Sequence, residues 1–125
     1  MSLKVEIREA DTPLSIKAAE ITAAGQYSLS DLFDLFDRVK EESDKRAAQA
    51  IILDITAVAG TIPCMDMYLL SVHCCRVLKL AVRVAIVSPD GEANNFFQNV
   101  TRNRGLQIAI VPNRYAAMKW VNQDR

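Results

Sequence analysis

The 125-residue sequence predicts an α/β domain with a mixed β-sheet and helices packed against it. Two observations support this class. Short apolar segments typical of strands alternate with longer segments of helical spacing, and a pair of strands opens the chain, which gives the order β-β-α-β-α-β-α-β-α. The length suits one hydrophobic core, so residues 1–125 are expected to form a single domain. The alternating order predicts parallel strands joined by right-handed crossovers.

The first two elements are expected to be strands. Leu3, Val5 and Ile7 alternate with charged residues, which is the period of a half-buried strand. The segment ADTPL, residues 10–14, is typical of a turn, and a second strand over 14–23 is expected to end before Gly25.

The segment 28–46 predicts the first helix. Its apolar residues recur at helical spacing, Ser28 or Ser30 can cap it, and carboxylates lie early in it. The segment 50–55, AIILDI, is apolar on both faces, as expected for a central strand that is covered on both sides.

A second helix is expected from about 62 to 80, with Pro63 in its first turn. The remaining pattern predicts two more strands and two more helices. They are a strand over 82–87, a turn SPDG over 88–91, a helix over 92–104 with Phe96, Phe97 and Val100 inward and Gly105 ending it, a strand over 106–111, and a helix over 113–121.

The composition argues against several functions. Lys plus Arg and Asp plus Glu both number 15, so the net charge is zero and nucleic-acid binding is not expected. Charged residues interrupt every apolar run before the roughly 20 residues of a membrane span. No secretion signal opens the chain, so a cytoplasmic location is expected. The three cysteines are expected to be reduced, and no spacing predicts a metal site or a cofactor.

Several segments resemble a known family. The element order, ILDITAV leading into a loop and a long helix, Asn103-Arg104-Gly105 before the last strand, and Ala117 and Trp120 in the last helix are similar to the STAS domain and the SpoIIAA-like, anti-sigma-factor-antagonist-like group. The resemblance implies a STAS-like fold and a regulatory function through protein interaction.

The resemblance also implies a strand-ending Asp, matched here by Asp54, and a serine at the helix start that a partner kinase phosphorylates. An alignment without gaps places Ile62 at the family's loop Asp and Pro63 at that serine. Since proline has no hydroxyl group, the sequence predicts a non-catalytic module without the phosphoserine switch.

A binding surface is expected beside residues 55–66, where α/β sheets commonly bind ligands. Its candidate residues are Asp54, Thr56, Thr61, Cys64 and Asp66, and its ligand is a protein or a small apolar or anionic molecule. Alternatives stay open for three of these residues. Asp54 is expected either to contact a ligand or to accept hydrogen bonds from backbone N–H groups of TAVAG. Thr61 is an alternative phosphoacceptor in a phosphorelay, and Cys64 is either a redox-sensing thiol or a small buried hydrophobic residue.

The predicted helix over 62–80 is apolar most of the way round. Either neighbouring helices cover it, or it forms an interface with a protein partner, a homodimer being expected, through Met67, Leu70, His73, Cys74 and Val77. His73 is expected on the side opposite Cys64 and on the same side as Asp66. Arg102, Arg104 and Arg114 form either an anion-binding corner or a solvated surface.

Overall fold

A computed structural model describes residues 3–10, 16–78, 82–88 and 92–123, with side chains from residue 97 onward in the last range. The predicted element order is confirmed. The elements are β1 (Lys4–Ala10), β2 (Ala18–Gln26), α1 (Leu29–Arg46), β3 (Ala50–Ala59), α2 (Cys64–Val77), β4 (Arg83–Val87), α3 (Glu92–Asn103), β5 (Gln107–Val111) and α4 (Arg114–Val121).

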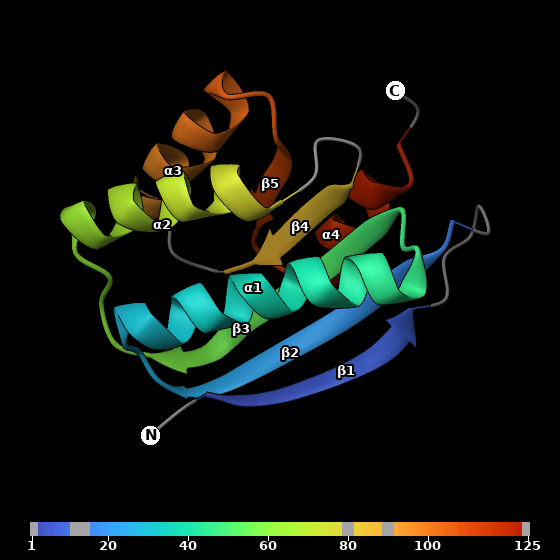
Figure 1. Ribbon diagram of the computed structural model, residues 1–125, viewed down its shortest axis with the longest axis horizontal. Coiled ribbons are helices and arrows are strands. Elements are labelled where there is room, and N and C mark those ends of the chain that lie inside the picture. The colour runs from blue at the N-terminus through green and yellow to red at the C-terminus, as the bar shows by residue number, and fades with distance from the viewer. Residues whose placement is uncertain (1–2, 11–15, 79–81, 89–91, 124–125) are drawn as a thin grey trace.

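The sheet is mixed, as predicted, and its strands lie in chain order, β1-β2-β3-β4-β5. β1 runs antiparallel to β2, whereas β2, β3, β4 and β5 are mutually parallel. Helices α1, α2 and α3 cover one face of the sheet, and α4 covers the other (Figure 1). Three crossovers of the same hand that step in the same direction place their helices on one face.

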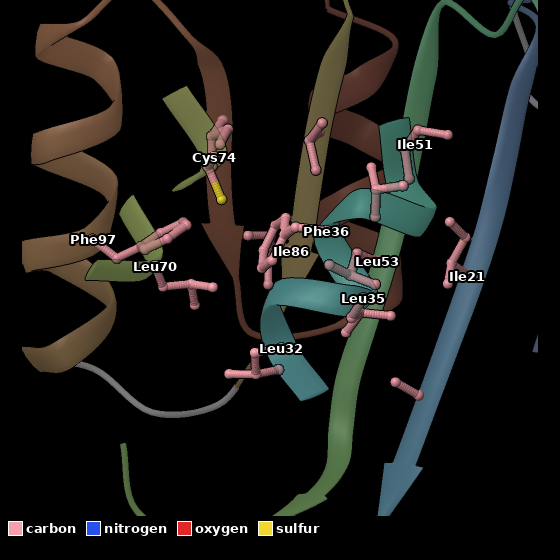
Figure 2. Packing of buried hydrophobic residues seen from close by; sticks show 14 of the residues in the cluster. Ile21, Leu32, Leu35, Phe36, Ile51, Leu53, Leu70, Cys74, Ile86 and Phe97 are labelled. Carbon is pink, nitrogen blue, oxygen red and sulfur yellow. The ribbon is translucent and has the colours of Figure 1, made fainter. Parts of the chain in front are cut away.

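Each face of the sheet carries a hydrophobic core. The larger core joins β-strand side chains such as Ile21, Ile51 and Leu53 to α1, α2 and α3 (Figure 2). The smaller core under α4 is rich in alanine and contains Ile52 and Val87. The first four residues of β3 are fully buried, which confirms the prediction of a central strand covered on both sides.

The first helix closely follows its prediction. The Ser28 hydroxyl accepts a hydrogen bond from the Asp31 N–H at 3.1 Å and so caps its start. At its other end Ala47 is the C-cap and adopts a left-handed conformation, with φ of 50° and ψ of 43°. A residue with a Cβ atom is strained in this conformation.

Two strands differ from their predicted limits. β2 spans 18–26 in place of 14–23, and Gly25 lies within it, opposite Val58 of β3. β3 continues to Ala59, past the predicted end at residue 55. A register shift between Thr22 and Ala24 of β2 lets β3 insert one extra residue and still pair with β2.

The second helix is shorter than the predicted 62–80. It begins at Cys64, with Pro63 as its extended N-cap, and ends at Val77 before the extended Leu78. Phe97 is buried and Val100 is half-buried, in agreement with the inward positions predicted for them. The predicted turns over 10–14 and 88–91, the end of the helix at 79–80 and the Phe96 side chain lie wholly or partly outside the described residues.

An ion pair with a buried carboxylate ties α4 to the sheet. The carboxylate of Glu20 on β2 accepts hydrogen bonds from Arg114 Nε and Nη2 at 3.0 Å and lies 3.3 Å from Arg8 Nη2. Burial of Glu20 acts to raise its carboxyl pKa, but the two guanidinium groups outweigh burial and hold the pKa below its usual value. Because Arg114 binds Glu20 and Arg102 Nε donates to the Ile108 carbonyl at 3.0 Å, neither is a purely solvated cation.

Candidate functional site

The carboxyl end of β3 extends beyond its neighbour β4. The last β3–β4 pair joins Asp54 to Val87, whereas β3 pairs with β2 as far as Ala59. Residues 55–59 therefore form a shelf with β2 on one side and no paired β4 residue on the other, among the described sheet pairs. This shelf leads directly into the segment that the sequence singled out.

The start of the shelf is fixed by Asp54. Its Oδ1 atom accepts hydrogen bonds from the Thr56 backbone N–H at 2.9 Å and from the Thr56 hydroxyl at 2.7 Å. The carboxylate thus holds the strand where it leaves the register of β4, as the structural alternative for Asp54 predicted. Its role in ligand binding stays a prediction.

Tyr27 anchors the far end of the same segment. Its backbone N–H donates to the Ala59 carbonyl at 2.8 Å, and its hydroxyl donates to the Asp66 carboxylate. Burial of the ring raises the pKa of Tyr27, and the hydrogen bond and negative charge of Asp66 raise it further. The segment 59–66 is therefore held at both ends by one residue of the β2–α1 connection, through its backbone at Ala59 and through its side chain at Asp66.

Gly60 allows this close approach. Its φ is +109°, and a Cβ atom built there would lie 3.1 Å from Gln26 Nε2 and 3.2 Å from Tyr27 Cβ. A side chain at this position would be strained in its backbone and crowded against Tyr27. The glycine thus lets the segment turn tightly over the end of β2.

Behind the segment lies a cavity of about 210 Å³. It is bounded by α1, the ends of β3, β4 and β5, and the inward faces of α2 and α3. Figure 2 shows Leu32, Phe36, Leu70, Ile86 and Phe97 converging on this space from four of these elements. Its lining consists of Leu32, Phe36, Ile55, Thr56, Val58, Gly60, Ile62, Met67, Leu70, Ile86, Ser88, Phe97 and Ile110.

The five predicted binding residues do not gather in one place. Thr56 lines the cavity, whereas Asp54, Thr61, Cys64 and Asp66 are not among its described lining residues. Thr61 and Cys64 are exposed on the segment that leads into α2. Asp66 is directed toward Tyr27. Of the five, Thr56 alone is a described lining residue of the cavity.

The predicted interface on α2 needs correction. Met67, Leu70 and Cys74 are nearly or fully buried in the larger core, because this face of α2 packs against the sheet and the neighbouring helices. They are unavailable to a partner in the folded chain. Val77 is half-buried.

His73 also faces the protein. Its Nε2 atom lies 2.7 Å from Asp37 Oδ1, and its ring stacks on Phe33 with centroids 4.6 Å apart. Both contacts are with α1, and Asp66 is directed toward Tyr27 in the connection that leads into α1. The spacing argument that placed His73 and Asp66 on one side of the helix is therefore confirmed.

The outward face of α2 carries the exposed apolar residues. Among the described residues the exposed large hydrophobic side chains are Met65, Tyr68 and Leu69 on α2, at 67%, 43% and 40% exposure, and Tyr115 on α4. Positions 65, 68 and 69 share one helical face, a signal present in the sequence. It was missed because Met67, Leu70 and Cys74 make an equally apolar pattern on the opposite face.

The three cysteines are free thiols in different environments. Burial raises the pKa of Cys74 well above its ordinary value, and burial also raises the pKa of Cys75 despite the opposing charge of Arg104. Cys64 is exposed and is the first residue of α2, so the buried alternative predicted for it is wrong. Cys64 is therefore the most exposed thiol of the three, Cys75 being half-buried.

The described residues lack two further features, a membrane-spanning helix and a metal-binding cluster. They contain no helix with the length and hydropathy needed to cross a bilayer. They also contain no cluster of three or more His, Cys, Asp or Glu side chains arranged to hold a metal ion.

Solved structures support the fold that the resemblance implies. An uncharacterized protein of the DUF3478 family with a SpoIIAA-like fold, from Shewanella loihica, matches with a TM-score of 0.57 and 18% identity over 95% of this chain and 94% of its own. An anti-sigma factor antagonist from Mycobacterium paratuberculosis matches with a TM-score of 0.55 and 13% identity over 96% of both chains. The anti-sigma factor antagonist SpoIIAA in its unphosphorylated form matches with a TM-score of 0.55 and 13% identity over 99% of this chain and 100% of its own.

These similarities establish a SpoIIAA-like fold for this chain. No protein-family model matches the sequence, and no curated protein matches it.

Proposed function

We propose that this chain is a non-catalytic regulatory module that binds a protein partner, in the first place a second copy of itself, and that has no phosphoserine switch. The proposed contact surface, called the α2 surface below, comprises the exposed residues of 56–65 together with Tyr68 and Leu69. The observation that carries the proposal is the clustering of Met65, Tyr68 and Leu69 on the outward face of α2. Exposed apolar patches commonly mark sites of protein interaction.

The charge pattern supports this surface. Between Asp54 and Asp66 the sequence has no Lys, Arg, Asp, Glu or His, although most of residues 56–65 are exposed. The centres of protein interfaces are depleted in charged residues and enriched in Tyr and Met. An uncharged shelf beside exposed Met65 and Tyr68 has this composition.

The start of α2 supports the absence of the switch. Pro63 is the extended residue that immediately precedes the helix, and it makes no side-chain hydrogen bond to the helix N-terminus. The family resemblance assigns the phosphorylated serine to this position, and proline offers no hydroxyl group there. Regulation in this chain is therefore proposed to act through binding.

Thr61 and Cys64 keep their alternative functions as separate predictions. Both are exposed, so a kinase could contact Thr61 and an oxidant could contact Cys64. Intact mass after incubation with kinases encoded by neighbouring genes tests the first alternative, and an unchanged mass refutes it. The rate of Cys64 alkylation against pH tests the second, and a rate that follows an ordinary thiol refutes it.

Sedimentation velocity tests the proposed self-association. At concentrations of tens of micromolar we expect a dimer, and we expect Leu69→Asp to weaken it about tenfold or more, because a charge would be buried in an apolar contact. Tyr115→Asp is the matched control, since Tyr115 is an exposed large hydrophobic residue on the opposite face of the sheet. Circular dichroism checks that both variants fold.

Two results would overturn the proposal. A wild-type monomer throughout this concentration range would rule out self-association. Equal weakening by Leu69→Asp and Tyr115→Asp would show that the contact does not lie on the α2 surface.

A further inference from the structure

The cavity behind the shelf has a chemistry that the α2 surface does not use. We propose that it binds a small, uncharged, largely apolar molecule that carries one hydrogen-bond donor, such as a phenol or an alcohol. This inference is distinct from the proposed docking on α2. The α2 side chains that line the cavity are the inward Met67 and Leu70, and only Thr56 and Gly60 belong both to the α2 surface and to the lining.

The walls of the cavity favour an apolar ligand. Its inner lining includes Leu32, Phe36, Leu70 and Phe97, all nearly fully buried core residues. None of the residues that line it carries a formal charge. Apolar cavities of this kind are poor hosts for water and bind apolar molecules instead.

The volume limits the size of the ligand. An engineered cavity of roughly 150 Å³ in another protein binds benzene. The cavity here measures about 210 Å³, which suits a benzene ring with a short alkyl substituent. A long acyl chain would have to project beyond it.

The polar groups at the entrance of the cavity determine which polar group of a ligand it favours. The Thr56 hydroxyl donates its only proton to Asp54, so toward a ligand it can act as an acceptor. The Asp54 carboxylate beside it disfavours a second negative charge. Ser88 adds a second hydroxyl to the lining. A neutral donor is therefore favoured over a carboxylate or a phosphate, which narrows the apolar-or-anionic ligand predicted from the sequence.

The overhang of β3 provides the entrance. Ile55, Thr56 and Val58 line the cavity from the part of β3 that has no β4 partner in the described pairing. Thr56 is exposed and Val58 is half-buried, so this side of the lining reaches solvent. The entrance lies outside the carboxyl ends of parallel strands, where ligands of open α/β sheets usually bind.

Three matched probes test the proposal on the full chain. They are para-propylphenol, which has a donor, para-propylanisole, which lacks it, and para-propylbenzoate, which is charged. In methyl-labelled NMR spectra we expect the phenol to shift the signals of Ile55, Ile86 and Ile110, which line the cavity, and to leave Ile52 on the other face unchanged. We expect the phenol to bind about tenfold or more tightly than either other probe.

Two variants locate the contact. Thr56→Val should reduce the affinity for the phenol to that for the anisole and leave the anisole unaffected, whereas Thr61→Val, in the same segment but outside the lining, should change neither. Val58→Phe should fill the mouth and block all three probes, which tests occupancy without relying on the hydroxyl.

The proposal is overturned by unshifted cavity methyl groups, by equal shifts at Ile52, or by tighter binding of the benzoate than of the phenol. Binding of the phenol that survives Val58→Phe unchanged would also overturn it. Self-association is tested separately by Leu69→Asp, and Leu69 does not line the cavity, so this proposal and the proposed docking function can fail independently.

Discussion

Removing Arg114 should cost more stability than removing its partner Glu20. The Glu20 side chain is 3% exposed, whereas that of Arg114 is 51% exposed. Arg114→Met leaves a buried carboxylate that is held by Arg8 at 3.3 Å, and Arg8 is itself 68% exposed. Removing one partner of a fully buried ion pair lowers the free energy of unfolding by about 3–5 kcal/mol. Because Arg114 is half exposed to solvent, we expect a smaller loss of about 2–3 kcal/mol for Arg114→Met.

Two matched variants, Glu20→Gln and Arg8→Met, give the losses of stability with which Arg114→Met is compared. Glu20→Gln keeps the volume of the side chain and leaves a guanidinium that can turn to solvent, so we expect a loss of about 1–2 kcal/mol. Arg8→Met removes an exposed partner and should cost at most about 1 kcal/mol. Urea unfolding followed by circular dichroism measures all three free energies, and each lost kcal/mol should lower Tm by roughly 3–5 °C.

The pH dependence of unfolding gives an independent test. The pKa of Glu20 in the folded chain lies below the ordinary value of 4.5, so its stabilisation is present above pH 4.5 and is lost as the pH falls through the folded pKa. In Arg114→Met the buried carboxyl group should have a raised pKa, so the loss caused by this variant should shrink as the pH is lowered toward about 4. Equal losses for Arg114→Met and Glu20→Gln at every pH, or a loss that grows with acid, would refute the reasoning.

Three further predictions concern the α1 terminus, Tyr27 and α2. Ala47→Gly should stabilise the fold by about 1 kcal/mol, seen as a higher urea midpoint, because glycine is unstrained at φ of 50°. Tyr27→Phe should cost about 1 kcal/mol near neutral pH. Because the folded pKa of Tyr27 is raised above its ordinary 10.0, wild type should lose this advantage above about pH 10, and a pH-independent difference would contradict the prediction. Leu70→Ala should cost about 2–5 kcal/mol in urea unfolding and half-exposed Leu69→Ala less than about 1 kcal/mol, and similar losses would contradict the assigned faces.

Much of the fold follows from local patterns in the sequence. The alternation of Val5 and Ile7, the helical spacing and Ser28 cap of α1, and the doubly apolar start of β3 each leave a periodic signal within a few residues. The later part of β3 does not. Ala57 and Ala59 have little strand preference, and their pairing with β2 depends on a register shift that only the assembled sheet defines.

The candidate site was less accessible to prediction. The sequence singled out the 55–66 segment and predicted that Asp54 accepts a hydrogen bond from a nearby backbone N–H, because both depend on neighbouring residues. It could not reveal the hydrogen bond from Tyr27 to Asp66, whose partners are 39 residues apart, or the cavity, whose lining comes from six elements. The sequence also could not show which face of α2 is buried. That helix is apolar on both sides, and its buried face is the one that packs in the core with α1 and α3.

The sequential strand order has a consequence for how the chain folds during synthesis. Each strand pairs with its neighbours in the chain, so a newly synthesised strand can add to the edge that the previous one left. The helix α4 emerges last, and until it does, Ile52 and Val87 on the second face of the sheet have no helix above them. A chain halted before residue 114 would already hold the five strands and the cavity and would still expose an apolar sheet face, so completion of α4 is the step that should end its exposure to chaperones and to aggregation.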